Sequence, residues 1–200
     1  LAALASWSQF TRADSVVVFN EVMYHPATNE AGLEWVELHN QNAVDVDLSG
    51  WKLASAIDFT FPEGTTIKGR GFLVIAASPS TLTNSTGITN VVGPFVGRLS
   101  NNGETIQLLD LNHRVMDRLT YGVDGVWPPG PDGSGASLAK LQSNLATVSP
   151  ESWATSEQLG GTPGTTNFPT LPTAPPNPHI VLNEIAPADA SSFWIEIFNA

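Results

Sequence analysis

Acidic residues that recur at matching positions are the first candidates for chemistry in this chain. Glu21 recurs as Glu184, and Glu37 recurs as Glu196, each within a stretch where apolar and polar residues alternate. A carboxylate in the middle of a strand is unfavourable unless it is solvated or paired. Glu21 and Glu37 therefore either bind a hard cation such as Ca²⁺, or pair with a strand neighbour such as Arg98 or Arg118 or with loop amides. We favour the second, structural interpretation.

Two further acidic residues, Asp124 and Asp132, lie in a stretch rich in glycine and proline. Their carboxylates suit Ca²⁺, but their spacing does not match an EF-hand loop. They are calcium candidates without a motif, and we predict that the chain uses no metal and no other cofactor. Ser134, in the sequence DGSGAS, resembles a nucleophile loop, although Asp, Gly and Ser are also the residues that form tight turns. A turn is our prediction there.

Motifs that identify enzymes are absent from the sequence. No lysine follows a glycine, so there is no phosphate-binding loop of the P-loop kind. The four histidines lie far apart, and there is neither an H-E-x-x-H sequence nor a G-x-S-x-G elbow. The chain has no cysteine, which excludes disulfides, thiol nucleophiles and cysteine-type zinc sites. We predict no catalytic residues and no enzymatic activity.

Tryptophan offers a second kind of candidate, a flat platform on which a sugar ring can stack. Trp35 alternates on the same face as Glu37, and Trp127 lies in a loop, so these two are the candidates for carbohydrate binding. The alternative is that both are packing residues. Trp194 recurs at the position of Trp35, and a recurring anchor favours packing.

Composition narrows the class of protein. Charged residues make up 14% of the 200 residues, against about 25% in average soluble proteins, while 17 Gly and 15 Pro supply many turns. The net charge of −11 argues against nucleic acid as a partner, because binding to phosphates depends on Lys and Arg. No stretch approaches the roughly 18 apolar residues of a membrane span, so membrane insertion is not expected.

Alternating apolar residues predict the elements that position these side chains. Strands are expected over 16–24, 33–40, 51–54, 58–61, 71–78, 104–111, 114–122 and, as a short addition, 137–141. Asn112-His113 marks a hairpin connection, and no segment shows a helical repeat. The predicted fold class is all-β, a sandwich of two antiparallel sheets.

Composition, strand pattern and an internal repeat divide the chain into four parts. Residues 1–13 are typical of the tail of a secretory signal peptide cut before Asp14, the alternative being an apolar extension of a longer protein. Residues 14–167 hold the complete set of strands, and 168–178 form a proline-rich linker. Residues 179–200 repeat the opening strands, because VLNEI and FWIEIFN match VFNEV and EWVELHN. They are predicted to begin a second, truncated domain.

The order of these motifs resembles the lamin tail domain, an immunoglobulin-like β-sandwich, in its bacterial secreted form. The similar segments are VVFNEVMYHP (17–26), EWVELHN (34–40), DLSGWKL (47–53), GRGFLVIAAS (69–78), GRLSNNGETIQLLD (97–110) and VMDRLTYG (115–122). The resemblance implies a binding, adhesion or spacer module outside the cell, in a longer protein with further domains downstream. Chromatin binding, known for the nuclear form, does not carry over, because no basic patch is visible.

These observations lead to one functional prediction with two alternatives. We expect a non-catalytic module of a secreted or cell-surface protein, whose ligand is an unidentified protein or polysaccharide. The first alternative is an accessory domain of a secreted hydrolase, nuclease or kinase-like enzyme whose catalytic domain lies beyond residue 200. The second is a carbohydrate-binding module.

Overall fold

The structure is a computed structural model that describes residues 15–169, 180–185 and 194–199. Contacts between residues divide the chain after Phe168 into two units, and each is described by itself. The predicted signal-peptide remnant, residues 1–13, lies outside the described residues, as does nearly all of the predicted linker, 168–178.

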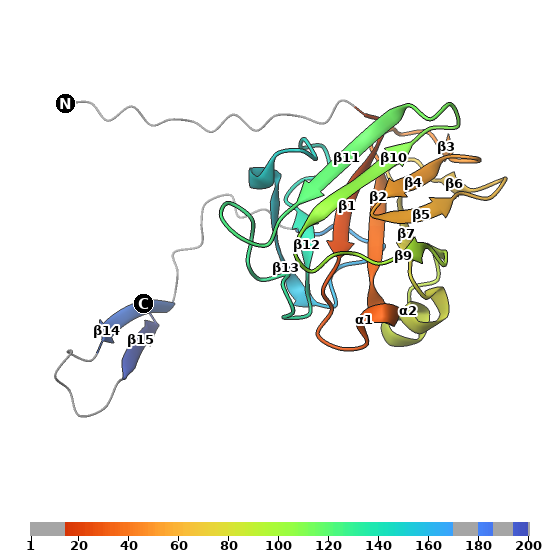
Figure 1. The fold of residues 1–200 in the computed structure, drawn as a ribbon. Helices are drawn as coiled ribbons and strands as arrows, with labels where there is room; N and C mark the ends of the chain where they lie inside the picture. Colours follow the sequence, from red (N-terminus) through yellow and green to blue (C-terminus); the bar gives the residue numbers. More distant parts are fainter. Residues whose placement is uncertain (1–14, 170–179, 186–193, 200) are drawn as a thin grey trace, which may run out of the picture. The chain divides into compact units, whose positions relative to one another are not determined.

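The larger sheet of the first unit has six strands in the order β13-β12-β1-β2-β7-β8 (Figure 1). These strands are β13 (Trp153–Leu159), β12 (Ala136–Lys140), β1 (Val17–Met23), β2 (Trp35–Asn40), β7 (Phe72–Ala76) and β8 (Val91–Val92). Neighbouring strands are antiparallel except β7 and β8. The pair β1–β2 lies at the centre, which gives its side chains neighbours on both sides.

The second sheet has five strands in the order β11-β10-β4-β5-β9. They are β11 (Val115–Tyr121), β10 (Glu104–Leu109), β4 (Lys52–Ser55), β5 (Ile57–Thr60) and β9 (Val96–Gly97), and a separate small ladder joins β3 (Val46–Asp47) to β6 (Thr66–Ile67). The turn between β10 and β11 contains His113 in the left-handed region, at φ 61°. The predicted hairpin at Asn112-His113 is therefore confirmed.

The main core lies between the two sheets. Phe19 and Leu38 from the larger sheet pack in one cluster with Leu53, Ile106 and Leu119 from the smaller one, and each is fully buried. This confirms the prediction of an all-β sandwich. Alternation along β2 sends Val36 and Leu38 into this core and Trp35 and Glu37 to the outer face of the sheet, as predicted.

The outer face of the larger sheet is also covered. Leu82 of helix α2 (Pro79–Thr86) packs on Met23 and Trp35 in a second apolar cluster. Helix α2 corrects the expectation of a structure without helices. Its Ser- and Thr-rich sequence lacks the apolar repeat by which a helix is predicted. Two short elements, α1 (Glu30–Leu33) and the 3₁₀ turn η1 (Pro150–Ser152), complete the unit.

The described residues of the second unit form a hairpin of β14 (Ile180–Ile185) and β15 (Ile195–Asn199). Its register repeats that of β1–β2. Glu184 faces Glu196 as Glu21 faces Glu37, and in both hairpins the register shifts at the residue before the first glutamate. The sequence repeat is thus also a repeat of strand pairing and of bulge position.

Candidate binding site

The two recurring glutamates lie side by side on the outer face of the larger sheet. Glu21 on β1 and Glu37 on β2 are paired across the strands, and both side chains are completely buried. A register shift between Phe19 and Glu21 forms a β-bulge at Asn20, which turns the Asn20 side chain toward Glu37. The structure therefore joins the residues that the sequence singled out.

Hydrogen bonds from the protein itself satisfy both carboxyl groups. Glu21 accepts bonds from the Ser137 hydroxyl and, at 2.9 Å each, from the backbone N–H and hydroxyl of Thr162. Glu37 accepts a 2.8 Å bond from the Asn20 amide and another from the backbone N–H of Gly164. Backbone amides of a loop, those of Thr162 and Gly164, are thus among the partners of the two carboxyl groups. The suggested pairing with an arginine is wrong. Arg98 lies against carboxylates of the α1 region, and Arg118 is on β11 of the other sheet, opposite Gln107.

The donors from Thr162 and Gly164 belong to residues 158–168, which we call the closing segment. Asn167 anchors this segment, since its amide donates 2.9 Å bonds to the backbone carbonyls of Asn20 and Lys140. Gly161 makes the close approach possible: its φ is +76°, and a Cβ there would lie 2.6 Å from Glu21 Oε1. The closing segment therefore covers the carboxyl pair and fixes it.

Burial sets the protonation of this pair. Desolvation is the main cause that raises the pKa of Glu21, and the hydrogen bonds from Ser137 and Thr162 oppose it. Desolvation raises the pKa of Glu37 well above its ordinary value, and the charge of Glu21 adds to this effect. Two buried carboxyl groups this close favour a shared, partly protonated state over a doubly charged one.

The arrangement does not resemble a calcium site, although Glu21 and Glu37 were calcium candidates. Their oxygens already accept hydrogen bonds from the protein. Among residues 15–169, 180–185 and 194–199, no group of three or more His, Asp or Glu side chains is arranged to hold a metal ion. The geometry supports a structural role for the pair.

Calcium should consequently leave the stability of the protein unchanged. We expect the melting temperature in millimolar Ca²⁺ to equal that in EDTA, because no carboxylate oxygen of the pair is open to a cation. A ligand at a hundred times its Kd would add about 2.7 kcal/mol to the free energy of unfolding, so a tight site would be visible in thermal melts. A rise in melting temperature that Glu37→Gln abolishes would contradict the structural role.

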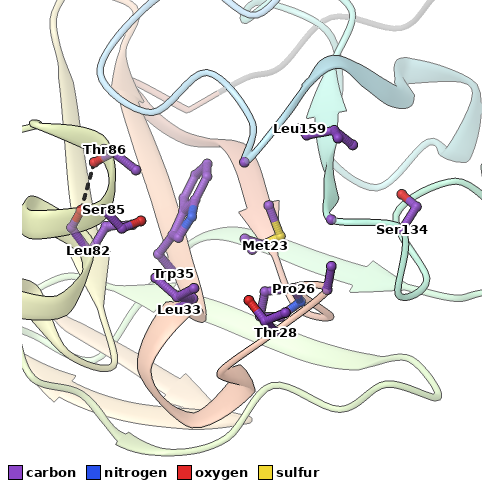
Figure 2. A pocket seen from close by; sticks show the side chains of 13 residues that line it. Met23, Pro26, Thr28, Leu33, Trp35, Leu82, Ser85, Thr86, Ser134 and Leu159 are labelled. Carbon is purple, nitrogen blue, oxygen red and sulfur yellow. Dashed lines mark hydrogen bonds between the residues drawn. The ribbon is translucent and has the colours of Figure 1, made fainter.

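The structure contradicts the hypothesis that Trp35 is a stacking platform for a sugar. Only 1% of its surface is exposed, because Met23 and Leu82 pack on it, so it is not an open platform for a sugar. Its ring instead contributes one wall of an apolar cavity of about 180 Å³ (Figure 2). Leu33 and Leu159 line the same cavity. The tryptophan thus has the packing role that its recurrence suggested.

The other candidates are spread over the surface. Trp127 is half-buried against the main core, and stacking there stays a prediction. Asp124 and Asp132 are exposed, and Asp132 pairs with His25 at 2.6 Å. The hydroxyl of Ser134 donates to the carbonyl of Gly130 and accepts from the backbone N–H of Ala136, which confirms the turn.

A buried lysine was missed by the sequence analysis. Lys140 on β12 is 1% exposed, and its ammonium group donates a 2.8 Å bond to Thr147, whose hydroxyl donates at 2.7 Å to Asp117. Desolvation lowers the pKa of Lys140 to about 8, with the charge of Asp117 opposing the shift. This chain of bonds ties β12 of the larger sheet to β11 of the smaller one. No local pattern marks it, because Asp117 lies 30 residues before Thr147 in the sequence.

Comparison with known protein families agrees with this architecture. The lamin tail domain profile matches residues 11–123, more than half of the chain. The chain belongs to the lamin tail domain family. Members of this family are immunoglobulin-like modules without enzymatic activity, so the fold class is the immunoglobulin-like sandwich that the sequence predicted. A search of curated proteins finds no significant match.

The lamin tail domain match ends before the residues that close the carboxyl pair. Strands β12 and β13 and the closing segment all lie after residue 123. They extend the larger sheet beyond β1 and bring in the donors of Ser137, Thr162 and Gly164. No helix in the described part of the chain has the length and apolar character to span a membrane.

Proposed function

We propose that this lamin tail domain is a non-catalytic binding or spacer module of a larger secreted or cell-surface bacterial protein. The observation that carries the proposal is the sealed carboxyl pair. Glu21 and Glu37 are the residues best placed for acid–base chemistry, yet both are fully buried and accept hydrogen bonds from the closing segment. A general acid or base must reach the proton that it transfers, and these two groups are out of reach of a substrate.

The second hairpin supports a tandem arrangement of such modules. Its register and bulge repeat those of β1–β2, whereas the residues equivalent to the buried Trp35 and Glu37 are exposed: Trp194 is 40% exposed, and Glu196 is exposed as well. An isolated two-stranded hairpin is marginal in water. We propose that further strands of the same protein cover this face in a second domain.

Export and binding can be tested together. If residues 1–13 are a signal-peptide remnant, the natural protein recovered from culture medium or cell wall should begin at Asp14, which N-terminal sequencing would show. The purified protein should bind a component of a panel of polysaccharides and surface proteins saturably and without converting it. Retention in the cytoplasm would overturn the secreted location, and turnover of a bound ligand would overturn the non-catalytic role.

A further inference from the structure

His25 lies between two carboxylates that belong to different segments of the first unit. Its Nδ1 atom is 2.6 Å from Asp132 Oδ1, and its Nε2 atom is 3.3 Å from Glu30 Oε1. Asp132 lies in the turn-rich segment that precedes β12, and Glu30 begins helix α1. Since His25 and Asp132 are 107 residues apart in the chain, this one ring bridges segments that are distant in sequence.

The protonation of the His25 ring decides whether both contacts are favourable. A neutral imidazole carries an N–H on one nitrogen and a lone pair on the other, whereas an imidazolium carries an N–H on each. An ionised carboxylate only accepts hydrogen bonds. A neutral His25 therefore donates to Asp132 or to Glu30 and turns a lone pair toward the other carboxylate. The protonated ring satisfies both sides of the observed geometry.

The groups around Glu30 keep its carboxylate charged. A hydrogen bond from the Asn101 amide is the main cause that lowers the pKa of Glu30, and Arg98 and His25 act in the same direction against desolvation. Arg98 lies 2.9 Å from Glu30 Oε2 and 3.6 Å from Oε1 of the buried Glu34, so it serves both carboxyl groups. Glu30 is thus an ionised partner for His25 in mildly acidic solution.

On the other side of the ring, the negative charge of Asp132 also acts on the buried hydroxyl of Tyr24. Burial is the main cause that raises the pKa of Tyr24, and Asp132 adds to it, so Tyr24 stays neutral at physiological pH. Histidine is the side chain that ordinarily changes its charge between about pH 5 and 8. In this cluster, a response to pH in that range is therefore expected from His25.

The bridge connects segments that line the apolar cavity beside Trp35 (Figure 2). Residues 26–28, which directly follow His25, line this cavity, and so do residues 134–135, which directly follow Asp132. Leu33 of α1 adds a further part of the wall. The contacts of His25 thus hold together the segments that shape the cavity.

We propose that His25 is a pH-sensitive clamp on the rim of this apolar cavity. With the ring protonated, Glu30 and Asp132 are tied together, and the segment before β12 is held against α1 and the end of β1. When the ring loses its proton, one of the two ties is lost and the rim opens more often. The clamp is independent of the binding or spacer role proposed above.

Hydrogen exchange of backbone amides in the full chain tests the clamp. The N–H of Leu33, which donates to the carbonyl of Asn29, reports on α1, and the N–H of Ala136, which donates to the Ser134 hydroxyl, reports on the other segment. A partly exposed ion pair shifts such an opening by roughly two- to fivefold. At least one of the two protection factors, which correct for the intrinsic effect of pH, should be lower by this factor at about pH 8 than at about pH 5. Equal protection at both pH values would overturn the proposal.

Two variants assign the effect to the bridge. His25→Gln carries no titratable group and should abolish the pH dependence of both protection factors. Asp132→Asn keeps the size of the side chain and should abolish it as well, because the ring then has one carboxylate partner. If His25→Gln retains the pH dependence of the parent, the clamp is wrong. If Asp132→Asn retains it, the ring responds through Glu30 alone, and the two-sided clamp is wrong.

His113→Asn is the matched control. His113 is exposed in the turn between β10 and β11, and its φ of 61° is a conformation that asparagine accepts. This variant removes one histidine away from the cavity and should keep the pH dependence of the parent. A loss of the effect in His113→Asn as large as in His25→Gln would show a general response to charge and would overturn the assignment to His25.

Discussion

Glu37→Gln will make the protein less stable than the parent in mildly acidic solution, and the difference will shrink as the pH rises toward the raised pKa of Glu37. The glutamine side chain offers one acceptor where the carboxyl group accepts two bonds, from Asn20 and from the backbone of Gly164. One buried donor then loses its partner, which costs about 1–3 kcal/mol. This loss does not depend on pH.

The pH dependence comes from the parent protein. Burial raises the pKa of Glu37 well above its model-compound value of 4.5, so the folded protein keeps a proton that the unfolded chain has released. A raised carboxyl pKa contributes stability that is complete below 4.5 and is lost as the pH rises toward the folded pKa. The proton on Glu37 contributes a loss of about 1.4 kcal/mol for each pH unit in that window, and the glutamine variant lacks this contribution. Glu21, whose pKa burial also raises, titrates in both proteins.

Chemical denaturation of both proteins across this pH range measures the difference. His39 and Lys140 titrate in the parent and in the variant, so their contributions cancel. Glu63→Gln is the matched control, because Glu63 is exposed and its replacement should change stability little at any pH. A difference between Glu37→Gln and the parent that stays constant or widens with rising pH would contradict the raised pKa.

The strands and the faces of their side chains could be predicted from the sequence. Alternation correctly places Val36 and Leu38 in the core and Trp35 and Glu37 on the opposite face, because successive side chains of a strand point to opposite faces of the sheet. It could not tell whether that opposite face is covered. Trp35 is buried by helix α2, whose sequence PSTLTNST has no apolar repeat. Its end signals were present, with Pro79 in the first turn and Gly87 at the C-cap.

The partners of the buried polar groups were beyond the reach of sequence patterns. Glu21 bonds to Thr162, 141 residues later, and Asp117 bonds to Thr147, 30 residues later, so both contacts join segments that are distant in the chain. Strand β13 is likewise absent from the expected strands, because Thr155, Ser156 and Glu157 give it no apolar alternation. It forms because its backbone pairs with that of β12 in an antiparallel ladder. Tertiary contacts, not local propensity, decide such segments.

The closing segment should decide whether the first unit folds at all. A protein ending at Glu157 lacks the backbone N–H groups of Thr162 and Gly164 and the Thr162 hydroxyl, all of which bond to Glu21 or Glu37. It also lacks the Asn167 amide that binds two backbone carbonyls. Hydrogen bonds to charged groups contribute about 1.5–3 kcal/mol each, so losing three is comparable with a typical total stability of about 5–15 kcal/mol. We expect no cooperative melt.

A protein ending at Phe168 is the matched comparison. It keeps every donor of the closing segment and loses only the second unit, which begins at Pro169. Its melting temperature should therefore equal that of the full chain. Its solubility should be higher, because the β14–β15 hairpin, with Trp194 and Ile195 exposed, presents strand edges that pair with other molecules.

Circular dichroism melts and light scattering on the three proteins, ending at 157, 168 and 200, separate these effects. A large drop in melting temperature on removal of residues 169–200 would mean that the second unit stabilises the first. A cooperative melt in the protein ending at Glu157 would mean that the carboxyl pair tolerates water in place of Thr162 and Gly164. The cover over the pair would then be dispensable for folding.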